Sequence, residues 1–468
     1  MSTQQQSPTL GTSPKPFLMK RRRYVFPPGL PHNLLFYLFR LFRPGEPIPL
    51  FTYLAEKYGE AAHYKLGRQH VVFLNHPDYI REVLVVQNQN FIKERTGRRM
   101  KILVGNGLIT SEGKFHKTQR ALSQPAFHRQ RIAHYGETMV EHALRYREGW
   151  RDGQRLELSA EMMHLALGIV ARTLFDTDVA QEVAEISANV NSIMALYDFL
   201  VVLPYAEGLQ YWPLPGVSRF RKARTRLDGV VYQMIEDHRR DAVDRGDLLS
   251  MLLAARYEDG SPMPDQQLRD EVMTIFLAGY ETIANALAWT WYLLSQNPEA
   301  ERKLHQEIDS VLQGRVPETV DLPNLSYTEM VLAEAMRLYP PVWAMGRQAT
   351  ADIEIGPYYL PEGTTMVLMQ YVMHRNPIYF PDPLRFDPER FTPEAKASRP
   401  RFSYFPFGAG TRQCIGEAFA WMEGVLILAT IAQKWRFSLV PGHRVEPLPL
   451  VTLRPKYGMK MIAHERKS

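Results

Sequence analysis

Apolar residues recur three or four positions apart over most of the chain, the spacing typical of helices that pack into a core. The longest such pattern follows residues 261–265, whose serine, prolines and aspartate are typical of a helix start. Beyond Thr282 nearly every face is apolar, which predicts that this helix of about thirty residues, roughly 45 Å long, crosses the interior. Between 139 and 240 the same spacing predicts helix after helix, with breaks at Pro204 and over 212–216.

Strand patterns are short and few. Residues 64–66 and 71–74, separated by Gly67, predict a hairpin, and further strands are expected at 353–355 and 365–369. The predicted fold class is therefore mainly α, with a large helical region and a smaller β-sheet region. We expect a disordered N-terminal arm over residues 1–26 and a single domain over 27–468.

The composition is that of an ordinary globular protein, with 45% hydrophobic and 23% charged residues. The net charge is +6, but lysine and arginine are scattered through the predicted helices, which argues against a nucleic-acid ligand. The apolar patch at 34–42 contains Arg40 and is too short to span a bilayer, so no transmembrane span is predicted, although a weak peripheral membrane contact remains open. The single cysteine rules out an internal disulfide and is compatible with a cytoplasmic location.

That cysteine, Cys414, lies in a loop with Gly408, Gly410 and Gly416, which permit a tight turn and a close approach to a partner. The apolar spacing after the loop predicts a helix over 417–434, so Cys414 is expected near a helix N-terminus, where a thiolate is stabilised. A lone thiolate suits one axial bond to a large flat cofactor better than zinc, which needs three or four protein ligands. The alternative is that Cys414 is a small buried core residue.

The pattern Phe407-x-x-Gly410-x-Arg412-x-Cys414-x-Gly416 resembles the haem-binding loop of the cytochrome P-450 family. The resemblance extends over residues 27–462 and implies the cytochrome P-450 fold of the soluble prokaryotic type. It also implies that Cys414 is the axial ligand of the iron of heme b, with Phe407 and Arg412 beside the cofactor.

Other basic positions match the family's haem-propionate ligands. A predicted helix carries His116 and Arg120 at i and i+4, so that both side chains share one face. The family usually has tryptophan where His116 stands, whereas Arg120 and Arg347 match. The resemblance implies that these residues and Arg412 pair with the propionates; a solvated basic helix face is the alternative for the first two.

The middle of the longest predicted helix contains Gly279, Glu281 and Thr282. Glycine there costs about 1 kcal/mol relative to alanine, and a buried carboxylate is expensive, so these residues are expected at a functional site. The segment resembles the acid–alcohol pair of the family's oxygen-activating helix. The resemblance implies that Thr282 and a water hold the oxygen while Glu281 relays protons; the alternative is a glutamate at a helix–helix contact.

Glu334 and Arg337 lie three residues apart on a predicted helix, and Arg390 follows downstream. Together they resemble the family's Glu-x-x-Arg helix and its third partner, and this resemblance implies a structural role behind the haem. His374 lies in another segment that resembles the family, and we do not expect it to be a metal ligand.

The resemblance implies a haem-thiolate monooxygenase that inserts one atom of O2 into a hydrophobic organic substrate. Electrons would come from NAD(P)H through a ferredoxin or flavodoxin and its reductase, steered by basic residues on the cysteine side of the haem: Lys114, Lys117, Arg399 and Arg401. A peroxide-driven peroxygenase and a non-enzymatic haem sensor or electron carrier are the alternatives. The candidate pocket residues are apolar or aromatic: Tyr197, Phe276, Ala278, Val342, Trp343 and Ala344.

Overall fold

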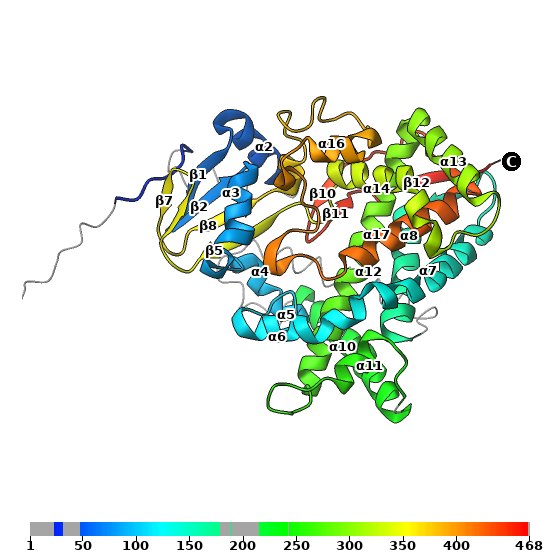
Figure 1. Cartoon of the computed structure of the whole chain (residues 1–468), viewed down its shortest axis with the longest axis horizontal. Helices are drawn as coiled ribbons and strands as arrows, with labels where there is room; N and C mark the ends of the chain where they lie inside the picture. Colours follow the sequence, from blue (N-terminus) through cyan, green and yellow to red (C-terminus); the bar gives the residue numbers. More distant parts are fainter. Residues whose placement is uncertain (1–22, 31–46, 178–188, 190–214, 242, 467–468) are drawn as a thin grey trace, which may run out of the picture.

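The structure, a computed structural model, describes residues 23–30, 47–177, 189, 215–241 and 243–466. Its helices form the larger part of the molecule, and strands β1, β2, β5 and β8 gather on the side away from α7 and α13 (Figure 1). This arrangement confirms the predicted fold class, a large helical region with a smaller β-sheet region.

The helices of the described chain vary from one turn to nine. They are α2 (Pro47–Tyr58), α3 (Pro77–Arg81), α4 (Arg95–Arg99), α5 (Lys101–Val104), α6 (Gly113–Ser123), α7 (Arg129–Gly149), α8 (Leu158–Phe175), α10 (Pro215–Asp241), α11 (Leu248–Ala254), α12 (Asp265–Gln296), α13 (Pro298–Leu312), α14 (Ser326–Leu338), α15 (Gln370–Met373), α16 (Pro393–Ala397) and α17 (Glu417–Ala432). The helix predicted over 417–434 therefore ends two residues early. The predicted break at Pro204 lies outside the described residues, and α10 begins within the predicted break at 212–216.

The strands form small sheets. They are β1 (Ala61–Leu66), β2 (Gln69–Leu74), β3 (Phe91–Ile92), β4 (Arg155–Glu157), β5 (Met345–Ala349), β6 (Ile353–Ile355), β7 (Tyr358–Leu360), β8 (Thr365–Leu368), β9 (Trp435–Leu439), β10 (Pro447–Pro449), β11 (Leu453–Pro455) and β12 (Lys460–Glu465). The largest sheet has the order β1-β2-β8-β5-β3, with β2 and β8 parallel.

The β1–β2 hairpin, predicted from its apolar runs, is confirmed with Leu66 paired to Gln69 across a two-residue turn. Gly67 has φ +59°, the left-handed conformation that such tight hairpin turns require and that glycine adopts at little cost. The strands predicted at 353–355 and 365–369 are confirmed as β6 and β8, the second ending one residue early.

Helix α12 is the central element of the helical region and packs against α8, α10, α14 and α17. It ends where Asn297 precedes Pro298, because the residue before a proline disfavours helical geometry. Its second half contains Trp289 and Trp291, both with no exposed surface. The prediction that this helix crosses the interior is confirmed.

Two described helices, α8 and α12, are long and apolar enough to cross a membrane by length and composition alone. In the structure most of each helix is buried among other parts of the chain. Burial of this kind is what the core helices of a folded domain show.

The prediction of an arm over 1–26 is wrong for its last residues. Val25 exchanges backbone hydrogen bonds with Tyr359 at 2.8 and 3.0 Å, and the ring of Phe26 stacks on His63 and His70. The polar and basic composition of this segment carries no period that would indicate such a pairing. Residues 1–22 lie outside the described residues.

Candidate active site

The loop that carries Cys414 is shaped by two glycines in the left-handed region, Gly408 with φ +68° and Gly410 with φ +69°. A Cβ on Gly410 would lie 1.9 Å from the carbonyl oxygen of Leu84, so no other residue fits there without displacing the backbone. The amide of Cys414 donates to the carbonyl of Phe407 at 3.0 Å and closes the loop.

Cys414 combines an accessible side chain with a deep position in the fold. The side chain is exposed, yet burial raises the pKa of its thiol to about 11, against the lowering effect of the Gly416 N–H and the Arg120 guanidinium. The two observations agree if the sulfur opens onto an interior space. Cys414 lies three residues before the start of α17 at Glu417, so its expected place near a helix N-terminus is confirmed. Direct coordination to a metal would deprotonate the thiol.

The basic residues identified from the sequence lie around this loop. Arg120 donates to the carbonyl of Gln413 at 2.7 Å, and Arg412 donates to the carbonyl of Ser111 at 2.6 Å and pairs with Glu112. Both arginines are therefore held against the cysteine loop and the start of α6.

His116 is buried on the same face of α6 as Arg120. Burial, together with the charges of Arg412, Arg120 and Lys93, lowers the pKa of the His116 imidazole to about 3. A neutral imidazole can still donate one N–H to an anion. The structure thus brings His116, Arg120 and Arg412 together, as the resemblance implies.

Lys93 lies near these basic residues, which together form a cationic cluster, but the sequence did not predict it as a site residue. Burial and the charges of Arg347 and Arg412 lower the pKa of its ammonium to about 7. It follows β3, which pairs with β5, the strand that contains Arg347. In the sequence Lys93 is a single lysine after a strand of two residues, and a strand this short shows no periodic pattern by which it could be recognised.

The cluster fits a cofactor with two acidic groups. Glu94 and Glu112 are the carboxylates whose charges act on Lys93 and Arg347, and Glu112 also acts on Arg412. A surplus of buried positive charge is unfavourable unless an anion neutralises it. The propionates of a haem bound by Cys414 would supply that anion.

Thr282 lies on a face of α12 that also carries Ala278, which is exposed although the helix crosses the interior. The Thr282 hydroxyl donates its hydrogen to the carbonyl of Ala278 at 2.9 Å. Its lone pairs remain available, so the hydroxyl can accept a hydrogen bond from a water molecule.

Phe276 is on another face of α12, where its ring packs against the rings of Phe175 and Tyr280, with ring centroids 6.0 Å apart in each case. This placement is a core position and does not support the predicted pocket role of Phe276.

Glu281 is 3% exposed, and its carboxylate already has partners. Oε1 accepts a short hydrogen bond from the Thr452 hydroxyl and another from Nε of Arg454 at 2.8 Å. Adjacent side chains on a helix point in different directions. Accordingly Thr282 bonds to its own helix while Glu281 bonds to the segment that contains β11.

Val342, Trp343 and Ala344 are half-buried in the turn between α14 and β5. The indole N–H of Trp343 donates to the carbonyl of Leu450 at 2.7 Å. This bond connects the turn to the hairpin of β10 and β11, called the C-terminal hairpin below. Tyr197 lies outside the described residues.

Glu334 and Arg337 form a fully buried bidentate ion pair, with N–O distances of 2.6 and 2.8 Å. Arg337 also donates to the carbonyls of His374, Pro383 and Arg385. Arg390 approaches Glu334 at 3.6 Å. This placement connects α14 with the chain before the cysteine loop and agrees with the structural role that the resemblance implies.

His374 links that network to the loop, because its Nε2 accepts the N–H of Phe405 at 3.0 Å. Burial, together with Arg337 and Arg375, lowers the pKa of the imidazole well below 6.5. Below pH 6.5 the unfolded chain takes up a proton that the folded chain does not. We therefore expect His374 to make the free energy of unfolding fall with decreasing pH, by up to about 1.4 kcal/mol per pH unit.

Chemical denaturation at pH 7.5 and 5.5 measures this dependence. His374→Gln is the matched variant, because its amide oxygen can accept the Phe405 N–H but does not titrate. We expect a smaller fall in its unfolding free energy between the two pH values; an equal fall in both proteins would contradict the prediction.

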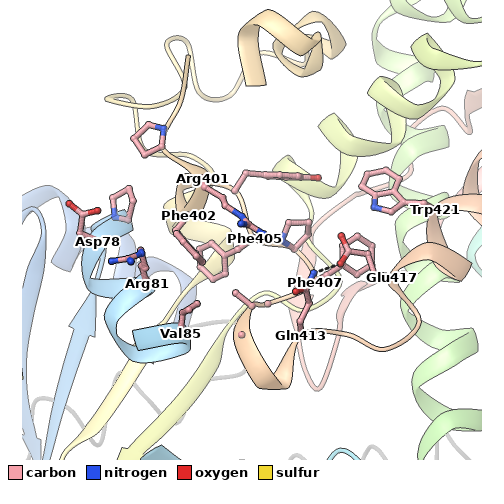
Figure 2. Close-up of a pocket in the computed structure, with 17 residues that line it drawn as sticks. Asp78, Arg81, Val85, Arg401, Phe402, Phe405, Phe407, Gln413, Glu417 and Trp421 are labelled. Atoms are coloured by element: carbon pink, nitrogen blue, oxygen red, sulfur yellow. Dashed lines mark hydrogen bonds between the residues drawn. The ribbon is translucent and has the colours of Figure 1, made fainter. Parts of the chain in front are cut away.

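A cavity of about 700 Å³ lies beside the cysteine loop, between it and α3 (Figure 2). Phe407 and Trp421 line it with ring centroids 5.6 Å apart, and Arg81 and Arg401 line it too. Such a cavity makes the outer side of the loop accessible to another molecule.

Of the other basic residues expected on this side, Lys114 is paired with Glu258 at 3.0 Å. Arg399 stacks over the rings of Phe380 and Phe391. These contacts favour a packing role for Arg399, whereas Lys117 is exposed.

Comparisons by family model, sequence and fold all find proteins similar to this chain. The family model described as Cytochrome P450 matches residues 27–461. Cyclooctatin synthase of Streptomyces melanosporofaciens is 39% identical over 448 residues, which are 94% of this chain and 96% of that protein. Pentalenene oxygenase of Streptomyces avermitilis is 35% identical and covers 85% of this chain and 88% of its own length.

Similarity in fold extends over almost the whole chain. The crystal structure of the cytochrome P450DA heme domain matches with a TM-score of 0.84 and 25% identity, covering 95% of this chain and 99% of that one.

Proposed function

Because the chain belongs to the cytochrome P450 family and is a haem monooxygenase, we propose that it hydroxylates a cyclic, largely hydrocarbon substrate of the terpenoid class. Relatives named cyclooctat-9-en-7-ol 5-monooxygenase, 37% identical, and pentalenene oxygenase support this class. The partly exposed side chains of Ala278, Val342 and Ala344 are apolar and agree with it.

The observation that carries the proposal is the accessible Cys414 in a closed glycine loop next to a surplus of buried positive charge. We propose that the cofactor is heme b, whose iron supplies O2 binding and activation when Cys414 coordinates it. Lys93, His116, Arg120, Arg347 and Arg412 would hold its propionates.

The reaction converts RH, O2, NAD(P)H and one proton into ROH, water and NAD(P)⁺. The chain's own part is to bind RH against apolar walls and to deliver protons through the Thr282 hydroxyl and its neighbours. We propose that NAD(P)H acts through a reductase and a ferredoxin or flavodoxin, and that the setting is the cytoplasm.

Two measurements test the proposal. Reduced protein treated with CO should give the red-shifted Soret band of a thiolate-bound haem. Ferric protein should shift from low to high spin when a cyclic terpenoid hydrocarbon binds, and the reconstituted system should yield its alcohol. A spin shift only with charged or strongly polar compounds would contradict the substrate class. Turnover with peroxide but not with NAD(P)H and redox partners would favour the peroxygenase.

Arg81 and Arg401, which line the cavity beside the cysteine loop, should steer an acidic redox partner. In the double variant Arg81→Gln, Arg401→Gln we expect partner-dependent reduction to slow about tenfold at low ionic strength. The difference should disappear near 1 M salt, where the Debye length is about 3 Å. Stopped-flow reduction measures the rate, and Lys114→Gln is the control because its charge is paired with Glu258. A salt-independent rate in the parent protein would contradict the prediction.

A further inference from the structure

The hairpin formed by β10 and β11 is fixed to the central helix at several points. The Thr452 hydroxyl donates to Glu281 and accepts from Nδ2 of Asn285 at 3.1 Å, so its orientation is determined from both sides. One turn further along α12, the indole N–H of Trp289 donates to the carbonyl of Leu453 at 2.9 Å. The hairpin therefore follows the second half of α12 closely.

Arg454 provides the only ion pair found for Glu281 among the described residues. Both Nε and Nη2 of Arg454 lie 2.8 Å from Oε1 of Glu281. The two side chains are 16% and 4% exposed. Breaking such a buried pair would leave a carboxylate without its cation, which is strongly unfavourable. Nε donates a charge-assisted hydrogen bond to Oε1, and Nη2 adds a close ionic contact to the same oxygen, so this oxygen is held in place.

The same hairpin contacts the turn that carries the candidate pocket residues. The amide of Leu453 donates to the carbonyl of Pro341 at 2.9 Å, and Trp343 donates to the carbonyl of Leu450. One short element thus touches both a wall of the predicted pocket and the acid of the predicted acid–alcohol pair.

We propose that Arg454 is a positioning residue for proton delivery, which holds the Glu281 carboxylate in one orientation against the β10–β11 hairpin, at the residue that precedes Thr282. This inference rests on the proposed monooxygenase function and deepens it. A carboxylate that must pass protons to the Thr282 hydroxyl through water needs a defined position, because proton transfer requires each hydrogen bond of the chain to be in place. Thr452 alone, a single neutral donor, would allow the carboxylate to rotate.

The yield of alcohol per pair of electrons depends on how well the Glu281 carboxylate is positioned, so it can be used to test the proposal. Productive turnover sends two electrons and two protons to one oxygen atom of O2, which leaves as water while the other enters the substrate. When protons do not arrive in order, the same two electrons and two protons convert O2 into hydrogen peroxide. The ratio of alcohol to peroxide per NAD(P)H is therefore the quantity to measure.

In Arg454→Met we expect the yield of alcohol per NAD(P)H to fall about tenfold, the low end for losing a group that orients a catalytic residue. Hydrogen peroxide should rise to match. Arg454→Lys keeps a positive charge without the Nε hydrogen bond and should recover part of the yield. Arg444→Met is the control, because it removes an exposed arginine that pairs with Glu446 ahead of the hairpin, and it should leave the yield unchanged.

A double variant separates positioning from general loosening of the hairpin. If Arg454 acts through Glu281, Arg454→Met should have no further effect on yield in a Glu281→Gln background. If the double variant loses yield by the product of the two single-variant factors, the proposal is overturned. An unchanged yield in Arg454→Met would also overturn it.

Hydrogen exchange gives a readout that is independent of turnover. In the haem-loaded protein, a peptide covering 447–455 should exchange faster in Arg454→Met and equally fast in Glu281→Gln, because either change breaks the same pair. Unchanged exchange in both would overturn the inferred role of the ion pair. An absent thiolate CO band in the parent chain, with normal exchange behaviour, would instead overturn the proposed function and would leave the pairing itself established.

Discussion

In Cys414→Ala we expect the reduced protein to show no thiolate-type Soret band with CO, and oxygenation to fall at least about 10²-fold, as when one essential group is removed. The physical reason is that Cys414 is the chain's only thiol, in a loop that only glycines can shape. No other side chain can supply the electron-rich sulfur that favours O–O cleavage.

Haem content has to be measured in the same preparations, because we expect Lys93, Arg120, Arg347 and Arg412 to retain part of the cofactor without the sulfur. We expect Cys414→Ala to keep part of its haem and Cys414→Ser to behave alike, since a hydroxyl matches the thiol in size but not in donor strength. A thiolate-type band in either variant would show that Cys414 is not the ligand.

The fold could be predicted where local patterns are strong. Helix α12 has a start signal, a sustained apolar period and a proline after its end. The β1–β2 hairpin has Gly67 at the turn. In contrast, β3 and β11 contain two and three residues, and the pairing of Val25 joins residues more than three hundred positions apart. Short strands carry no readable period, so their pairing depends on the tertiary fold.

The candidate site could be predicted as a set of residues but not as a set of contacts. The loop motif identifies Cys414, whereas the raised pKa of its thiol comes from its burial in the folded chain. Lys93 joins the cationic cluster only because β3 pairs with the strand of Arg347. Arg454 reaches Glu281 from 173 positions away. Ion pairs of this kind depend on which elements become neighbours, and spacing along one helix cannot reveal them.

Replacing Thr282 by alanine should uncouple electron consumption from product formation. The Thr282 hydroxyl donates to Ala278 within the helix, so toward the proposed site it can accept a hydrogen bond from a water molecule. Thr282→Ala should fold, bind haem and substrate and consume NAD(P)H, because the lost bond is internal to α12 and the side chain is only half-buried. Alcohol per NAD(P)H should fall by roughly 10² or more, in the range of general acid–base contributions, with hydrogen peroxide rising in its place.

Thr282→Ser is the matched control, since it keeps the hydroxyl and removes only a methyl group. We expect it to retain most of the yield, which would assign the effect to the hydroxyl and not to packing. Turnover driven by added hydrogen peroxide should be less affected in Thr282→Ala, because peroxide already carries the two protons that the chain would otherwise deliver. An unchanged yield per NAD(P)H in Thr282→Ala would place the proton path elsewhere, and the ion pair between Glu281 and Arg454 would then be a structural contact between α12 and the C-terminal hairpin.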